Sequence, residues 1–181
     1  MARINVFENI PNLQILALLN GPAVGSLNIH QVFIPGSLSF NNVAIVMTGS
    51  GAVSEDASLY FGLYSLNGAS LSLANSASAA TGLTLNQTMR SWITFATSAT
   101  QDITPGNWYF AFMSSTSLGG GFTYYANSAT SIGGATYGGP FLWGRASATQ
   151  SDMPASIATS DLDKDTDTIT SNVHPYIVIS A

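Results

Sequence analysis

The sequence predicts an all-β protein built as an antiparallel sandwich or barrel. Short runs of β-branched and aromatic residues recur along the chain, and such residues suit the half-buried strands of a sheet. Clusters of Gly, Pro, Asn and Ser separate these runs at the spacing of a sandwich or barrel. The one helix-like stretch, 13–19, is brief and has no capping residue, so we expect little helix.

The strand pattern covers most of the chain after an N-terminal stretch. The final predicted strand ends one residue before the end of the sequence. We expect it to be paired in the sheet because an unpaired Ile-Val-Ile edge would promote aggregation. In order, the predicted strands are 27–35, 43–48, 57–66, 69–74, 89–96, 107–113 and 175–180.

The pair Asn67-Gly68 predicts a hairpin, because Asn-Gly suits the positive φ angles of a type I′ turn. A two-residue loop would pair Leu66 with Ala69, whereas a three-residue loop would pair Leu63 with Leu73. The sequence leaves this choice of register open.

In either register the strand 57–66 is apolar on both faces, and we expect one face to fill the core while the other meets a neighbouring subunit. The two-residue loop places Leu59, Phe61 and Leu63 on one face and Tyr60, Tyr64, Leu66, Leu71 and Leu73 on the other.

A second turn, Thr104-Pro105-Gly106-Asn107, fits type II, with Pro at its second position and Gly at its third. In the strand that follows, Trp108, Phe110 and Phe112 alternate with smaller or more polar residues. This alternation predicts that the three aromatic rings lie on one side of the sheet.

We expect one β-sandwich domain over 26–181, preceded by an N-terminal arm over 1–25. A composition shift at 21–25 marks the boundary. The segment 114–144 holds three glycine clusters interleaved with aromatic residues, and we expect it to be a loop.

The composition excludes several classes of function. Charged residues make up 7% of the chain and the net charge is −5, whereas a nucleic-acid-binding protein needs a basic surface. The absence of cysteine excludes disulfides, zinc–thiolate sites and thiol catalysis. The N-terminal apolar run is too short for a signal peptide, and no run approaches the roughly 18 apolar residues of a membrane span.

The one cluster of charge is the acidic run Asp161, Asp163, Asp165 and Asp167. Carboxylate oxygens are ligands that calcium prefers, so a weak calcium site is one hypothesis and a solvated acidic loop is the default. An EF-hand loop beginning at Asp161 is rejected, because it would need glycine at 166 and glutamate at 172.

Residues for catalysis are scarce. The two histidines are His30 and His174, and no G-x-S-x-G motif accompanies them. Glu55 and Asp56 are chain neighbours, whereas glycoside hydrolysis needs carboxylates on opposite sides of a bond. We therefore expect no catalytic residues, no cofactor and no enzymatic activity.

Aromatic residues of the segment 114–144 are the best candidates for a binding site. Exposed Tyr and Trp on a glycine-rich loop can stack on sugar rings or anchor in a partner's groove. The structural alternative is that the loop packs these side chains beneath its own sandwich. The candidates are Tyr124, Tyr125, Tyr137 and Trp143.

Several segments of the sequence resemble those of a group of tailed-bacteriophage virion proteins. They are LYSLNGASLSL at 63–73, Ser91-Trp92, ITPGNWY at 103–109 and HPYIVI at 174–179. These proteins are jelly-roll-like β domains that serve as head decoration (cement) proteins, head fibres or tail tips. The resemblance covers roughly 27–181 and implies a jelly-roll-like antiparallel β-sandwich, frequent trimers and no enzymatic activity. It carries over no site residues.

The expected function is therefore that of a non-enzymatic capsid decoration or cement subunit on the virion exterior, made in the host cytoplasm. The expected partners are further copies of the chain, as a homotrimer, and the major capsid protein or other virion proteins. The alternative is a receptor-binding module of a head fibre or tail tip, which would bind a host surface glycan. We expect the arm either to attach the subunit to the capsid or to form the core of the trimer. The candidate residues for attachment are Ile4, Val6, Phe7, Ile10 and Leu13.

Overall fold

The structure is a computed structural model. It describes residues 5–8, 17–20, 25–48, 51–52, 59–78, 84–85, 91–114, 123–128, 143–147, 152–164, 173–175 and 177–180.

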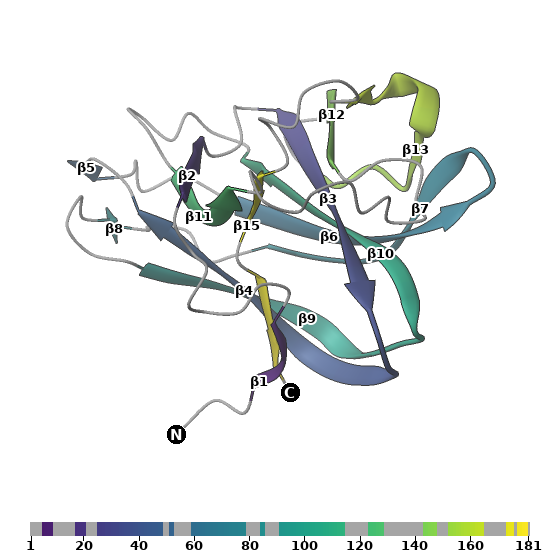
Figure 1. The fold of residues 1–181 in the computed structure, drawn as a ribbon, viewed down its shortest axis with the longest axis horizontal. Coiled ribbons are helices and arrows are strands. Elements are labelled where there is room, and N and C mark those ends of the chain that lie inside the picture. Colours follow the sequence, from purple (N-terminus) through teal and green to yellow (C-terminus); the bar gives the residue numbers. More distant parts are fainter. Residues whose placement is uncertain are drawn as a thin grey trace.

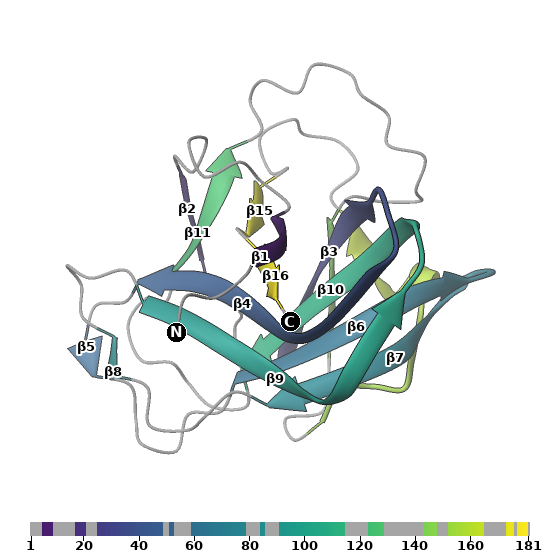
Figure 2. The ribbon, with the colours of Figure 1, turned by 90° about the horizontal axis from the view of Figure 1, so that it is seen from below.

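Two antiparallel sheets and one short additional strand pair make up the described residues (Figures 1 and 2). Sheet A contains β1 (Asn5–Glu8), β2 (Ala17–Asn20), β4 (Leu38–Thr48), β9 (Ser91–Ile103), β11 (Thr123–Ser128), β15 (Val173–Pro175) and β16 (Ile177–Ser180). Sheet B contains β3 (Ser26–Ile34), β6 (Leu59–Asn67), β7 (Ser70–Ser78), β10 (Gly106–Ser114), β12 (Trp143–Ser147), β13 (Ser156–Ala158) and β14 (Asp163–Lys164). The additional pair is β5 (Gly51–Ala52) with β8 (Thr84–Leu85), and a 3₁₀ turn, η2 (Thr159–Asp161), precedes β14.

This arrangement confirms the prediction of an all-β sandwich. For β1, β2, β5, β8, β11, β14 and β15 the structure describes the backbone alone. The predicted pairing of the last strand is also confirmed, because β16 lies between β1 and β4 in sheet A. The two sheets approach each other along one side of the sandwich, where β7 lies near β9.

A folded two-stranded ribbon connects the sheets. β3 pairs with β10 in sheet B and β4 pairs with β9 in sheet A. The ladder runs through the corner between them, with Ile34 opposite Gly106 and Leu38 opposite Ile103. The chain turns at 35–37 and again at 104–105, so both turns carry it from one sheet to the other.

The second predicted turn therefore differs from its expected form. Gly106 has a φ of +141°, well beyond the roughly +80° of a type II turn, and it begins β10. The strands that flank this turn do not pair with each other, because β9 lies in sheet A and β10 in sheet B. The indole Nε1–H of Trp108 donates to the carbonyl oxygen of Thr104 at 2.9 Å and fixes the corner.

The hairpin between β6 and β7 is present, but its register is neither of the two predicted. Asn67 pairs with Ser70 and Leu66 with Leu71, so Gly68 and Ala69 form the two-residue loop. Gly68 has a φ of +60°, and every non-glycine residue that the structure describes has a negative φ. This is the pattern of a type II′ turn, which needs a positive φ only at its first central residue.

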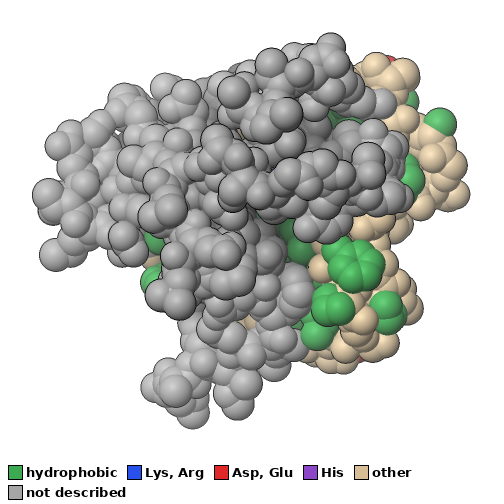
Figure 3. Space-filling model, in the orientation of Figure 1, with side chains coloured by type: hydrophobic (Ala, Val, Ile, Leu, Met, Phe, Trp, Pro, Cys, Tyr) green, Lys and Arg blue, Asp and Glu red, His purple; other side chains and the backbone are tan. Residues whose placement is uncertain are grey.

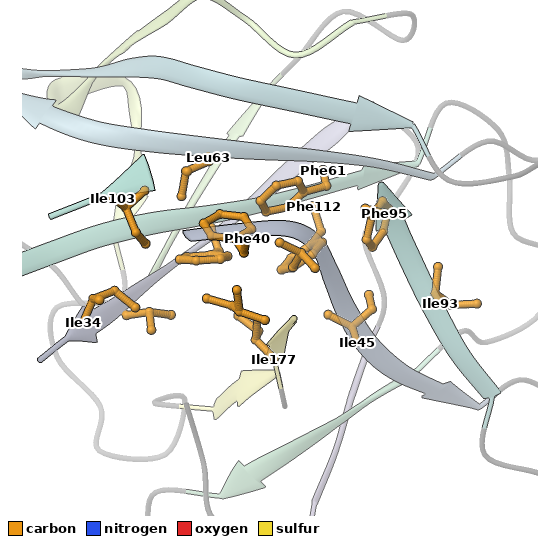
Figure 4. Close-up of a cluster of buried hydrophobic side chains, with 14 of the residues drawn as sticks. Ile34, Phe40, Ile45, Phe61, Leu63, Ile93, Phe95, Ile103, Phe112 and Ile177 are labelled. Carbon is orange, nitrogen blue, oxygen red and sulfur yellow. The ribbon is translucent and has the colours of Figure 1, made fainter. Parts of the chain in front are cut away.

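The main core lies between the two sheets (Figure 4). Phe61 lies at its centre, with its ring centroid 5.7–5.8 Å from those of Phe95, Phe110 and Phe112. The predicted face of Trp108, Phe110 and Phe112 is confirmed, since two of these rings are buried in this core and the third packs against it. The buried members are Val32, Ile34, Phe40, Val43, Ile45, Leu59, Phe61, Leu63, Ile93, Phe95, Ile103, Phe110, Phe112, Ile177 and Ile179.

A second core covers the other face of sheet B. The segment 152–162, here called the strap, supplies Met153, Ile157 and Leu162 to it. The apolar outer face of β6 is thus covered within the chain at Tyr64, whereas Leu66 on the same face is exposed. Contact of this face with a neighbouring subunit stays a prediction. From the sheet itself come Leu27, Ile29, Tyr64, Leu71, Tyr109, Ala111, Met113 and Ala146.

Sheet B must curl strongly for the strap to reach across it. β13 and β14 are its two outermost strands, yet Ala158 and Asp163 are only five residues apart. Five extended residues span at most about 17 Å, whereas the outer strands of a flat seven-stranded sheet are about 29 Å apart. Figure 1 shows β12 and β13 on either side of the turn that closes this gap.

Hydrogen bonds fix the strap to β6 and β7. The hydroxyl of Tyr64 donates to the carbonyl oxygen of Pro154 at 2.8 Å. The backbone N–H of Leu73 donates to Ala155 O at 2.9 Å, and that of Thr159 donates to Ala69 O at 2.8 Å. Because these bonds satisfy backbone groups beside the sheet edge, the strap also protects that edge.

Replacing Gly62 with alanine is expected to lower the free energy of unfolding by about 1–3 kcal/mol, the usual cost of overpacking a core. A Cβ at this position would lie 2.7 Å from Cε2 of Tyr64, 3.2 Å from Sδ of Met153 and 3.3 Å from Cδ1 of Leu73. Urea denaturation measures the change. Gly36→Ala is the matched control, because nothing lies within 4 Å of its Cβ. Equal stability of the two variants would contradict close packing between strap and sheet.

Candidate functional site

The aromatic candidates lie on two different sheets. Tyr124 and Tyr125 belong to β11, where Tyr124 pairs with both Leu19 of β2 and Met47 of β4. Trp143 begins β12 in sheet B, opposite His30. The segment 114–144 is therefore not one continuous loop. Tyr137 lies outside the described residues, and a binding role for the four residues stays a prediction.

The predicted arm contributes two strands to sheet A. β1 pairs with β16, with Phe7 opposite Ile179, and β2 pairs with β11. Val6 and Phe7 therefore belong to a paired strand. Attachment to a capsid stays a prediction, and its other candidates, Ile4, Ile10 and Leu13, lie outside the described residues.

The acidic run is described only at its start. Asp161 is exposed in η2 and accepts a hydrogen bond of 3.2 Å from the Ser160 hydroxyl. Asp163 is the first residue of β14, while Asp165 and Asp167 lie outside the described residues. Within the part of the chain that is described, no three His, Cys, Asp or Glu residues come together as a metal site.

The two histidines lie on different sheets. His30 is buried on β3 with its ring centroid 6.4 Å from that of Phe112, and His174 lies on β15 opposite Asn127. Glu55 and Asp56 lie outside the described residues.

The electrostatics of the second core favour neutral side chains. Burial raises the pKa of the Tyr64 phenol well above its ordinary value of 10.0, and the negative charge of Asp152 raises it further. Burial also raises the pKa of Tyr109. Both phenols are therefore neutral at pH 7 and serve as packing groups, with Tyr64 also a hydrogen-bond donor.

The exposed surface of the described residues carries few charges. Among the residues whose side chains the structure describes, the charged ones are Asp102, Asp152 and Asp161, and all three are exposed. Three large apolar side chains are also exposed: Phe33 at 55%, Trp92 at 50% and Leu66 at 38%. Figure 3 shows hydrophobic side chains gathered on the described surface near the tip of β3 and the adjoining corner.

Phe33 and Leu66 belong to one row of side chains across sheet B. On β3, Phe33 is directly opposite Asn107 of β10. On the other side of β10, the ladder with β6 pairs Trp108 with Ser65, which places Leu66 beside Asn107. Residues opposite each other in a ladder project from the same face of the sheet. We call this row of Phe33, Asn107 and Leu66 the platform.

Beside the platform lies a buried amide. Gln31 precedes Phe33 by two residues on β3 and so projects from the same face. Its side chain is 7% exposed, and its Oε1 has no hydrogen-bond partner among the described residues. A buried acceptor without a donor costs about 1–3 kcal/mol, and this oxygen has almost no surface accessible to solvent.

The platform is not among the sites that the sequence predicts. Phe33 occupied an ordinary position in a predicted strand, and its exposure depends on where the sheet ends beside the corner. The signal that could have found it is Pro35-Gly36 two residues later, since a turn there places the end of the strand at the rim of the sheet.

The fold and the candidate site define an antiparallel β-sandwich protein with a partly apolar surface at one corner. No protein-family model matches the chain, and no curated protein matches it as a relative. Among the described residues, no helix has the length and apolar character needed to cross a membrane.

Proposed function

We propose that the protein is a non-enzymatic structural subunit of a tailed-bacteriophage virion. It decorates the capsid exterior as a homotrimeric, jelly-roll-like cement protein. The β-sandwich architecture agrees with this proposal, and so does the resemblance of the segments 63–73, 103–109 and 174–179 to virion proteins of that type.

The observation that carries the proposal is the low number of charged side chains on the described surface. Soluble domains commonly carry charges on about 25–35% of their surface residues. Here the exposed charges on the described surface are three carboxylates, and equally many large apolar side chains are exposed. Such a surface suits a subunit that is packed against other proteins when it functions, because the centres of interfaces are depleted in charged residues.

The proposed mechanism is stabilisation by mass action. A subunit that binds neighbouring capsid proteins in the intact shell, and not in the ruptured one, shifts the equilibrium toward the intact shell. The segment 1–25 is the proposed capsid-facing element. Rupture of the shell would then require these contacts to break first.

Particles that lack this protein are expected to release their genome at a lower temperature than wild-type particles, and purified protein added back should restore the wild-type temperature. A dye that fluoresces on released DNA measures the transition. The location of the chain is checked by cryo-electron microscopy of intact particles. Regular density over the head lattice supports the proposal, whereas unchanged heat and osmotic resistance without the protein contradicts cementing.

A receptor-binding module at a head fibre or tail tip is the second candidate, and the exposed aromatic ring on the platform favours it. This candidate expects density at a fibre or tail tip and none on the head lattice. It also expects slower adsorption to host cells after Tyr→Ala changes at 124, 125 and 137. Normal adsorption by those variants would contradict a role for these tyrosines.

A further inference from the structure

We propose that Asn67-Gly68, at the tip of the β6–β7 hairpin, is a site of spontaneous covalent modification. The side-chain amide of Asn67 converts to a mixture of aspartate and isoaspartate through a succinimide, at a rate that the strap limits. This inference goes beyond the virion role proposed above and does not depend on it, because every reacting group other than water belongs to this chain.

The reaction needs only the chain and water. Hydroxide removes the backbone N–H proton of Gly68, and the nitrogen then attacks Cγ of Asn67. The new N–Cγ bond closes the succinimide, while the bond from Cγ to the amide nitrogen breaks and that nitrogen leaves as ammonia, with its extra proton taken from water. Water then opens the ring. Breaking the new N–Cγ bond leaves aspartate, breaking the original backbone bond leaves isoaspartate, and no oxidant or reductant is consumed.

The reacting groups are exposed and uncrowded. Asn67, Gly68 and Ala69 are all exposed. Apart from the chain neighbours, no described atom lies within 4 Å of a Cβ placed on Gly68. Asparagine is a thermolabile residue, and a following glycine hinders ring closure least because it has no side chain. The tip therefore combines the reactive dipeptide with free access for water and hydroxide.

The nucleophilic nitrogen lies outside the β-ladder. Asn67 and Ser70 form the last pair of the hairpin, and Gly68 is the first residue of the two-residue loop. The backbone bonds of that closing pair use Asn67 and Ser70 themselves. Within the described part of the chain, the N–H of Gly68 donates none of the backbone hydrogen bonds of turns and loops. Deprotonation of this nitrogen therefore breaks no bond of the sheet.

Ring closure requires the tip to open, and the strap opposes opening. Asn67 is the last residue of β6, and in extended backbone the following nitrogen points away from the side chain, so the Cα–C bond must rotate. Thr159 restrains the tip, because its backbone N–H and its hydroxyl donate to Ala69 O at 2.8 and 3.0 Å. Local opening costs least free energy at such loop tips. The rate of modification therefore depends on how often these bonds break.

The products are expected to weaken the hairpin and its contact with the strap. Isoaspartate routes the main chain through Cβ and Cγ of residue 67, which lengthens it by a methylene group and disrupts the pair with Ser70. Both products add a carboxylate next to the exposed Leu66, on a chain whose net charge is −5. We therefore expect the modified protein to unfold at a lower temperature than fresh protein.

The test incubates the full chain at mildly alkaline pH and follows it by chymotryptic peptide mapping. Mass spectrometry detects the exchange of amide nitrogen for oxygen, and chromatography separates isoaspartate from aspartate. We expect Asn67 to be modified at least about tenfold faster than Asn107, a difference of about 1.4 kcal/mol in activation barrier. Asn107 is the internal control, because it precedes the bulky Trp108 on a strand that is paired on both sides. The other Asn-Gly pair, Asn20-Gly21, lies in a separate peptide.

Two variants test the chemistry and the role of the strap. Asn67→Gln keeps an amide but would have to close a larger ring, so modification at this position should disappear while the fresh variant stays as stable as wild type. Thr159→Val removes the hydroxyl bond to Ala69 O and keeps the shape of the side chain. Because a hydrogen bond that restrains opening is lost, modification of Asn67 should be about twofold or more faster.

Modification of Asn67 that is no faster than that of Asn107 overturns the proposal, and so does equal modification of wild type and Asn67→Gln at this position. An unchanged rate in Thr159→Val, with its thermal unfolding close to wild type, overturns the control by the strap. None of these results alters the heat resistance expected of particles with and without the protein. Failure of the modification site is therefore distinguishable from failure of the virion role.

Discussion

Replacing Phe61 with alanine is expected to lower the free energy of unfolding by about 3–5 kcal/mol, the usual cost of truncating a buried phenylalanine. The Phe61 side chain is fully buried between the sheets, and its ring meets those of Phe95, Phe110 and Phe112. The truncation loses the transfer free energy of the ring and leaves a cavity whose walls come from both sheets. Because the free energy of unfolding of such domains is only about 5–15 kcal/mol, this one change removes a large part of it.

Chemical denaturation monitored by tryptophan fluorescence measures the loss. Phe61→Leu keeps more of the volume and should cost about half as much or less. Phe33→Ala serves as the exposed control, because its ring is 55% accessible to solvent, and it should change stability by less than about 0.5 kcal/mol. A similar loss in the buried and exposed variants would contradict the placement of Phe61 at the centre of the main core.

The protein is expected to lose stability steeply above about pH 10, because two buried phenols resist ionisation. The pKa values of Tyr64 and Tyr109 are both raised above 10.0 in the folded state. Above that pH the unfolded chain gives up these protons while the folded chain keeps them, so rising pH favours the unfolded chain. The stabilisation is fully present below pH 10 and is lost as pH rises toward the folded pKa values.

Each phenol that stays protonated only in the folded state contributes a slope of about 1.4 kcal/mol per pH unit. Urea denaturation between about pH 8 and about pH 11.5 measures this dependence. Tyr64→Phe should lower stability at neutral pH by about 1 kcal/mol through loss of the bond to Pro154 O, and it should make the alkaline slope shallower. Tyr109→Phe should also make it shallower, and the double variant shallower still. An identical slope in all four proteins would contradict burial of these phenols under the strap.

Local sequence patterns predicted the strands well. Alternation over 107–113 placed Phe110 and Phe112 on one face, and both rings are buried in the main core. The apolar character of 57–66 on both faces was also a correct signal, because β6 lies between two cores. These predictions succeeded because the side-chain period of a strand is a property of the backbone and not of its neighbours.

The register of the β6–β7 hairpin is a feature that local sequence patterns did not predict. Asn-Gly suggested type I′, with both residues in the loop, but Asn67 stays in the ladder and Gly68-Ala69 forms a type II′ loop. Both turns use a glycine with positive φ, so the dipeptide alone does not separate them. The strap favours the type II′ loop over the type I′ loop, since Thr159 donates hydrogen bonds from its backbone N–H and its hydroxyl to the carbonyl oxygen of Ala69.

By itself, the sequence determined the fold class, the six longest strands with the last one, and the low number of charges on the surface, all of which follow from residue type and period. Only the tertiary structure decided which turns join paired strands and which cross between sheets, as at 104–105. It also decided that the strap covers β6 at Tyr64. The exposure of Phe33 beside the buried Gln31 belongs to this second group as well. The physical reason is the same in each case: burial and pairing depend on segments far apart in the sequence, whose meeting no local pattern encodes.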